Sequence, residues 1–89
     1  MELIWSPQSL QDIEDIGHYI AEDQPNRAKL FVEELIKSVE RLSEFPESGK
    51  IILENPIFRQ VVHQKYRLIY QVRINKILII TVLSPRRDK

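Results

Sequence analysis

The period of the apolar residues changes once along this chain, and that change constrains the fold more than any other feature. Between residues 28 and 42 the apolar side chains recur at spacings of three and four, which predicts an amphipathic helix. From residue 58 onward they alternate with polar residues or run continuously, as is typical of strands. We therefore expect helices before the change and a sheet after it, which is an α+β fold.

A strand and two helices are predicted in the first half. Residues 2–5 form the strand, and Ser6 and Pro7 after it are typical of a helix start, with serine as the cap. The first helix runs from about residue 7 to about residue 22. The second begins at Pro25, and its apolar stripe, together with Trp5, is assigned to the core. This helix ends near Phe45-Pro46, and the short connection between the helices predicts an antiparallel hairpin.

Three strands are predicted after a loop at 47–56, and they form an antiparallel meander. They cover residues 58–64, 66–73 and 77–84, with Asn75-Lys76 as the turn between the last two. Alternation divides the middle strand into two faces: Leu68, Tyr70, Val72 and Ile74 toward the helices, and Arg67, Ile69, Gln71 and Arg73 away from them. The last strand is apolar on both faces, so we expect it to be central, and a partner segment is a natural cover for its second face.

Charge is distributed unevenly although the net charge is zero. Residues 1–49 hold eleven acidic and four basic side chains, for a net charge of −7, whereas residues 50–89 hold nine basic and two acidic ones, for +7. Such a chain can present one acidic and one basic face. The basic face either meets nucleic acid or an acidic protein surface, or is neutralised by the chain's own helices.

Other features exclude several classes of protein. Eighty-nine residues suit a single domain spanning 1–89. There is no cysteine, and two separated histidines lack a carboxylate at ligand spacing, so we expect neither a disulfide nor a metal or other cofactor. No apolar run approaches the length of a membrane span. We expect a cytoplasmic protein that does not associate with membranes.

Four local motifs, in order and at matching spacing, resemble those of the RelE/ParE superfamily of bacterial toxins. They are residues 5–16 (WSPQSLQDIEDI), 46–49 (PESG), 66–72 (YRLIYQV) and 82–88 (VLSPRRD). The resemblance covers nearly the whole chain, and the last motif is similar to the C-terminal end of ParE-type members. It implies a β-α-α-β-β-β fold and the toxin of a type II toxin–antitoxin system, neutralised by a cognate antitoxin that also mediates contact with operator DNA.

Two targets exist within this superfamily. ParE-type toxins inhibit DNA gyrase and block replication, whereas RelE-type toxins cut messenger RNA on the ribosome. The cleaving branch usually places tyrosine, often beside histidine, at the C-terminal end, and residues 84–89 contain neither. The resemblance therefore favours binding to gyrase over enzymatic activity. A ribosome-dependent endoribonuclease using His63 and Arg67 is the alternative, and a non-toxic member acting only in an antitoxin complex is the third.

Candidate contact residues are all basic. Arg86, Arg87 and Lys89 lie in the ParE-like C-terminal motif and are predicted to bind the target, because guanidinium groups suit bidentate contacts with carboxylates. A second group is predicted to contact the antitoxin or the target: Arg59, Lys65, Arg67 and Arg73. No residue is assigned a catalytic role in the favoured interpretation.

Overall fold

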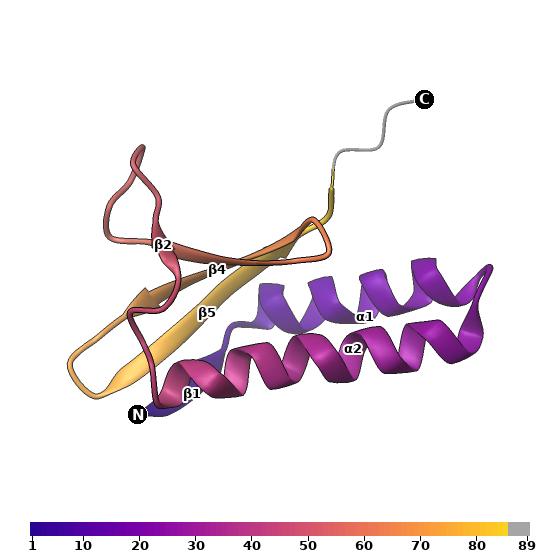
Figure 1. The fold of residues 1–89 in the computed structure, drawn as a ribbon, viewed down its shortest axis with the longest axis horizontal. Helices are drawn as coiled ribbons and strands as arrows, with labels where there is room; N and C mark the ends of the chain where they lie inside the picture. Colours follow the sequence, from indigo (N-terminus) through magenta and orange to yellow (C-terminus); the bar gives the residue numbers. More distant parts are fainter. Residues whose placement is uncertain (86–89) are drawn as a thin grey trace.

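A helical hairpin packs on one face of a five-stranded sheet (Figure 1). The computed structural model describes residues 1–85. Its helices are α1 (Pro7–Ala21), α2 (Pro25–Glu40) and a 3-10 turn, η1 (Arg41–Ser43). Its strands are β1 (Glu2–Trp5), β2 (Lys50–Ile51), β3 (Arg59–His63), β4 (Tyr66–Val72) and β5 (Lys76–Leu83). The predicted α+β class, the N-terminal strand, the hairpin and the three-stranded meander are confirmed.

The strands lie in the order β1-β5-β4-β3-β2. β1 is parallel to β5, and every other neighbouring pair is antiparallel. β5 is therefore a central strand, as its apolar sequence predicts. The sheet buries one face against α1 and α2, and the core joins Phe31 and Leu35 of α2 to Tyr70 and Ile79 of the sheet.

Polar side chains form hydrogen bonds with the part of the β5 edge that lies beyond its pairing with β1. β1 ends opposite Ile79, and the Ser6 hydroxyl then donates to the carbonyl of Ile80 at 2.7 Å. The same oxygen accepts the N–H of Ser9 at 3.0 Å and so caps α1, as the sequence predicts. Further along, the Asp12 carboxylate accepts the N–H of Val82 at 2.9 Å. The N-cap of α1 and Asp12 within it thus take the place of a strand as hydrogen-bonding partners of β5.

The turns differ from the prediction in two places. The hairpin between β4 and β5 turns at residues 74–75, not at Asn75-Lys76, because the Arg73 N–H donates to the carbonyl of Lys76 at 2.8 Å and makes Lys76 part of the hairpin ladder. Ile74, predicted to face the helices, is 99 % exposed, since β4 ends at Val72 and Ile74 lies in the turn. Positive φ angles occur instead in the β3–β4 turn, at Gln64 and Lys65.

The segment after the second helix also differs. The α-helix ends at Glu40 and continues only as η1, before the predicted end near Phe45. The predicted loop at 47–56 contains the short strand β2, which pairs with the first two residues of β3. A two-residue strand has too little alternation to be seen in the sequence.

Candidate functional site

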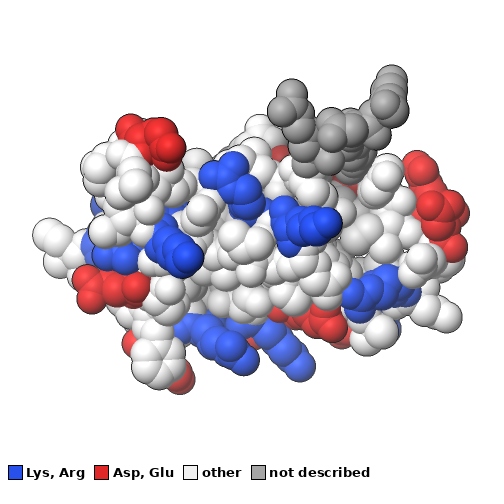
Figure 2. Space-filling model, turned by 45° about the horizontal axis from the view of Figure 1, so that its top comes forward, with Lys and Arg blue, Asp and Glu red and all other residues white. Residues whose placement is uncertain are grey.

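The sheet face opposite the helices, called here the outer face, carries a mixture of basic and aliphatic side chains. Pairing aligns Val62, Arg67 and Leu83 in one row across three strands on this face. Figure 2 looks partly onto it and shows Lys and Arg side chains across the surface, with acidic ones mainly at the margins. Basic side chains therefore gather on a surface that the helices do not cover.

Neighbouring amides orient two of the predicted contact arginines. The Arg67 Nε donates to the Gln60 side-chain oxygen at 2.7 Å, and the Arg73 Nε donates to that of Gln71 at 2.9 Å. Among residues 1–85 neither guanidinium forms an ion pair with a carboxylate, so the remaining donors of each are not used by a described acid. Lys65 is exposed in the β3–β4 turn. These three cations are presented to solvent, as a contact role requires.

Arg59, the fourth residue of that group, is held by hydrogen bonds and an ion pair within the chain. Its guanidinium donates to the backbone carbonyls of Gly49 at 2.9 Å and Glu47 at 3.3 Å, and lies 3.9 Å from the Glu47 carboxylate. These contacts hold the segment between η1 and β2 against β3. Arg59 thus has a structural role that the sequence interpretation did not include, and its predicted contact role remains a prediction.

Tyr70 holds the same segment from the helix side of the sheet. Its hydroxyl accepts the N–H of Gly49 at 2.9 Å and donates to the carbonyl of Pro46 at 2.8 Å. Burial raises the pKa of the phenol, and the Gly49 N–H and the charge of Arg59 oppose that shift. The core-facing position predicted for Tyr70 is confirmed, but its hydrogen-bonding role was missed because its partners are backbone groups more than twenty residues away.

The alternative catalytic pair is not brought together. His63 lies on the helix side of the sheet, where its Nε2 is 3.2 Å from the Glu34 carboxylate and its ring centroid is 5.4 Å from that of Phe31. Arg67 lies on the outer face, beside Gln60. Alternation along the β3–β4 pair places the two side chains on opposite faces of the sheet. They are not placed to act on a single phosphate.

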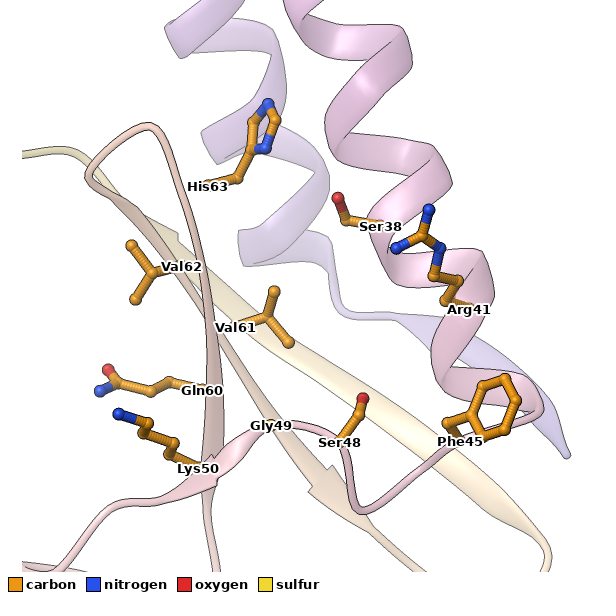
Figure 3. A pocket seen from close by; sticks show the side chains of 10 residues that line it. All are labelled: Ser38, Arg41, Phe45, Ser48, Gly49, Lys50, Gln60, Val61, Val62 and His63. Carbon is orange, nitrogen blue, oxygen red and sulfur yellow. The ribbon is translucent and has the colours of Figure 1, made fainter.

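An open groove of about 660 Å³ lies between β3 and the C-terminal end of α2 (Figure 3). Its lining residues are Ser38, Arg41, Phe45, Ser48, Gly49, Lys50, Gln60, Val61, Val62 and His63. Arg41 and Lys50 are charged, and none of the ten is acidic. The sequence interpretation missed this groove because it assembles residues from four separate elements.

Arg86, Arg87 and Lys89 lie outside the described residues. Within residues 1–85, no group of three metal-ligating side chains is placed to hold an ion. In the same part of the chain, no helix combines the length and apolarity needed to cross a bilayer.

The fold and the basic face define the class first: a small α+β protein with a helical hairpin on one face of its sheet and basic side chains on the other. The family model described as "ParE toxin of type II toxin-antitoxin system, parDE" matches residues 3–89. The chain therefore belongs to the ParE toxin family of type II toxin–antitoxin systems, which implies an antitoxin partner.

A solved structure supports the same fold. The chain matches one described as "Chromosomal ParDE TA system from P. aeruginosa" with a TM-score of 0.82 and 21% sequence identity, over 97% of each chain. No curated protein matches by sequence.

Proposed function

We propose that this chain inhibits bacterial growth by binding DNA gyrase, without chemistry of its own, and that its cognate antitoxin neutralises it. The observation that carries this proposal is the outer face, where Arg67 and Arg73 are exposed, held by neighbouring amides and not paired with any described carboxylate. Membership of the ParE family supports the toxin role, and the C-terminal motif with Arg86 and Arg87 resembles the gyrase-directed branch.

Geometry favours binding over RNA cleavage by the residues first considered. His63 contacts Glu34 on the helix side, whereas Arg67 projects from the other side of the sheet. General acid–base cleavage needs its proton-transfer group and its charge-stabilising cation at one phosphate. A binding role needs only that the cations share an accessible surface.

The experiment is induction of the chain alone in bacteria, with parallel pulse labelling of DNA and protein synthesis. We expect DNA synthesis to fall first while translation continues, and the purified chain to inhibit supercoiling by gyrase. An early fall in protein synthesis with discrete cuts in messenger RNA would overturn the proposal in favour of the endoribonuclease. No growth phenotype, in a host with the native gyrase, would favour a member acting only in its antitoxin complex.

A matched pair of variants tests the basic C-terminal residues. The double substitution Arg86→Ala and Arg87→Ala removes two cations from the ParE-like motif, and we expect it to abolish growth inhibition at equal soluble levels. Lys29→Ala with Lys37→Ala removes the same charge from exposed positions on α2 and should leave inhibition intact. Equal loss in both double variants would point to net charge and not to a local contact.

A further inference from the structure

The turn between β3 and β4 has an unusual backbone for its sequence. Gln64 and Lys65 have φ angles of 49° and 73°, and no other non-glycine residue within 1–85 has a positive φ. This left-handed region brings the Cβ of an L-residue too close to the backbone, so glycine and asparagine are the residues that usually occupy it. Two neighbouring residues of the turn are therefore strained.

The geometry of the turn calls for a different pair of residues. His63 pairs with Tyr66 across a two-residue connection, and positive φ at both central residues defines a type I′ turn. Asn-Gly is strongly preferred in such a turn because it adopts these angles with little strain. Strained residues cluster at functional sites, so the use of Gln-Lys here needs an explanation.

Contacts within the chain explain Gln64. Arg27 of α2 donates to its side-chain oxygen at 2.7 Å, and its amide nitrogen donates to the Glu34 carboxylate at 3.4 Å. Arg27 and Glu34 lie about two turns apart on one face of α2, and their charged groups are 3.8 Å from each other. The Gln64 side chain thus ties the turn to α2 at two points.

No contact of this kind explains Lys65. The residue is exposed, and its side chain forms no ion pair or hydrogen bond with any other residue in 1–85. Glycine at this position would relieve the strain without the loss of a contact within that part of the chain. The requirement for a lysine therefore lies in a partner, and an ammonium group suits an anionic one.

Lys65 lies beside the exposed arginine of β4. Arg67 is two residues further along, its Nε is oriented by Gln60 at 2.7 Å, and no described carboxylate pairs with its guanidinium. The hairpin end therefore presents two unpaired cations, one of them at a strained position that α2 holds through Gln64.

We propose that the β3–β4 turn is a positioning element for target binding, in which Gln64, held by Arg27 and Glu34, fixes the turn so that Lys65 contacts an anionic group of gyrase next to Arg67. The strain at Lys65 is retained because that position must carry a cation. This inference rests on the gyrase part of the proposed function, and it adds one contact residue and the residues that position it.

The first test replaces the strained pair by the pair that the turn prefers. Gln64→Asn with Lys65→Gly should raise the urea midpoint of unfolding by about 0.5 M or more, because the strain is removed. We expect the same variant to need at least a tenfold higher concentration for half-inhibition of gyrase supercoiling. Damage to the fold does not produce greater stability together with weaker inhibition. Unchanged inhibition, or a midpoint that does not rise, would overturn the proposal.

Single variants at residue 65 test the requirement for charge. Lys65→Gly removes the cation and leaves the contacts of Gln64 in place, whereas Lys65→Arg keeps the positive charge. We expect the glycine variant to inhibit gyrase at least tenfold more weakly and the arginine variant to stay within threefold of the unmodified chain. Equal losses in the two variants would show that a cation at this position is not what the target binds.

Arg27 tests the positioning role, because it contacts Gln64. Arg27→Ala releases one of the two ties on the turn, and we expect inhibition to weaken at least threefold. Arg27→Lys retains a donor for the Gln64 oxygen and should restore most of the loss. The control is Lys29→Ala, which removes an exposed cation from the same part of α2 and should leave inhibition unchanged. Equal effects of Arg27→Ala and Lys29→Ala would contradict a positioning role.

A double-variant comparison separates positioning from a general effect of Arg27 on the fold. In a chain that already carries Lys65→Gly, Arg27→Ala should have little further effect on inhibition, because no cation remains to be positioned. A structural role of Arg27 predicts the same loss with or without Lys65. Additive losses in the double variant would therefore exclude the proposed coupling.

Failure of this inference is distinguishable from failure of the proposed function. If the unmodified chain inhibits gyrase and the Asn-Gly variant inhibits it equally well, the role of the turn is wrong while the function stands. If the unmodified chain does not inhibit gyrase, the proposed function fails and this inference falls with it.

Discussion

The hydroxyl of Tyr70 and the backbone N–H of Gly49 form a 2.9 Å hydrogen bond that joins the middle of the sheet to the segment after α2. The same hydroxyl donates to the carbonyl of Pro46 at 2.8 Å. Tyr70 is fully buried, so these backbone groups depend on it for a partner. This contact turns residues 46–49 under the sheet and thereby shapes the groove beside β3.

Removal of the hydroxyl should destabilise the fold. Tyr70→Phe leaves the Gly49 N–H and the Pro46 carbonyl without their partner, and a buried unsatisfied polar group costs about 1–3 kcal/mol. We expect the free energy of unfolding in urea to fall by that amount. A variant that unfolds with the same free energy as the unmodified chain would show that these buried hydrogen bonds contribute nothing to stability.

The contribution of Tyr70 to stability should depend on pH. Burial raises the pKa of its phenol above the ordinary value of 10.0. The folded chain therefore keeps the proton longer than the unfolded chain does. Stability from this group is fully present below the unfolded pKa and is lost as pH rises through the folded pKa.

Urea unfolding of the unmodified chain and of Tyr70→Phe, from about pH 8 to about pH 11, measures this dependence. We expect the stability advantage of the unmodified chain to shrink above about pH 10, where the unfolded phenol ionises. An advantage that stays constant across the whole range would be inconsistent with a raised pKa.

Gly49 should not tolerate a side chain. A Cβ atom built there would lie 2.5 Å from the Tyr70 hydroxyl oxygen and 2.7 Å from the carbonyl oxygen of Gln60. Because the Gln60 carbonyl belongs to β3, it cannot move without disturbing the sheet. We expect Gly49→Ala to lower the free energy of unfolding by about 1–3 kcal/mol, as overpacking typically does.

The other glycine provides the control. A Cβ at Gly17 in α1 would lie 3.4 Å from a Val32 methyl group, which is ordinary contact. Gly17→Ala should therefore be neutral or stabilise the helix by up to about 1 kcal/mol. Thermal unfolding of both variants checks the contrast, and a stable Gly49→Ala variant would contradict the close approach.

Asp12 in α1 should stabilise the sheet through its hydrogen bonds with β5. Its carboxylate accepts both the Val82 N–H and the Thr81 hydroxyl at the edge of β5. Asp12→Ala leaves these donors without their partner, and we expect a loss of about 1–3 kcal/mol in the free energy of unfolding. Asp15→Ala is matched, because Asp15 accepts a side-chain amide from Gln11 just as Asp12 does from Gln8, but it is exposed. A comparable loss at Asp15 would mean that the contact with β5 adds little.

The outer face should carry target binding. Arg67→Glu with Arg73→Glu reverses two oriented cations, and we expect at least a tenfold higher concentration of the chain to be needed for half-inhibition of gyrase supercoiling. The matched variant, Lys29→Glu with Lys37→Glu, should inhibit as the unmodified chain does. Inhibition that is unaffected by the outer-face variant would exclude these arginines from the target contact.

Much of the fold could be predicted because it depends on local pattern. The spacing of apolar residues in α2, the cap at Ser6 and the alternation in β4 each act over a few residues, and each appears in the structure as expected. The β4–β5 turn could not be placed to the residue, because the register of β4 against β5, with Val72 opposite Ile77, decides it. β2 was missed for a similar reason, since its two residues become a strand only beside β3.

Part of the candidate site could also be predicted from the sequence, and part could not. The alternation of side chains along β4 was enough to predict that Arg67 and Tyr70 face opposite sides of the sheet. It could not show that Arg59 is held by Glu47 and Gly49, or that His63 contacts Glu34 of α2. The basic residues of the C-terminal motif remain predictions from the sequence.

By itself, the sequence determined the class of the fold, the order of its elements, the separation of charge and the resemblance to ParE toxins, because these properties follow from residue type and short-range periodicity. Only the tertiary structure decided which backbone groups lack a strand partner and which side chains share a groove. Residues 61–63 of β3 have no strand neighbour on this side within the described chain, because Tyr70 holds Gly49 under the sheet and β2 begins only at Lys50. Such a relationship joins residues distant in the chain, and no local pattern encodes it.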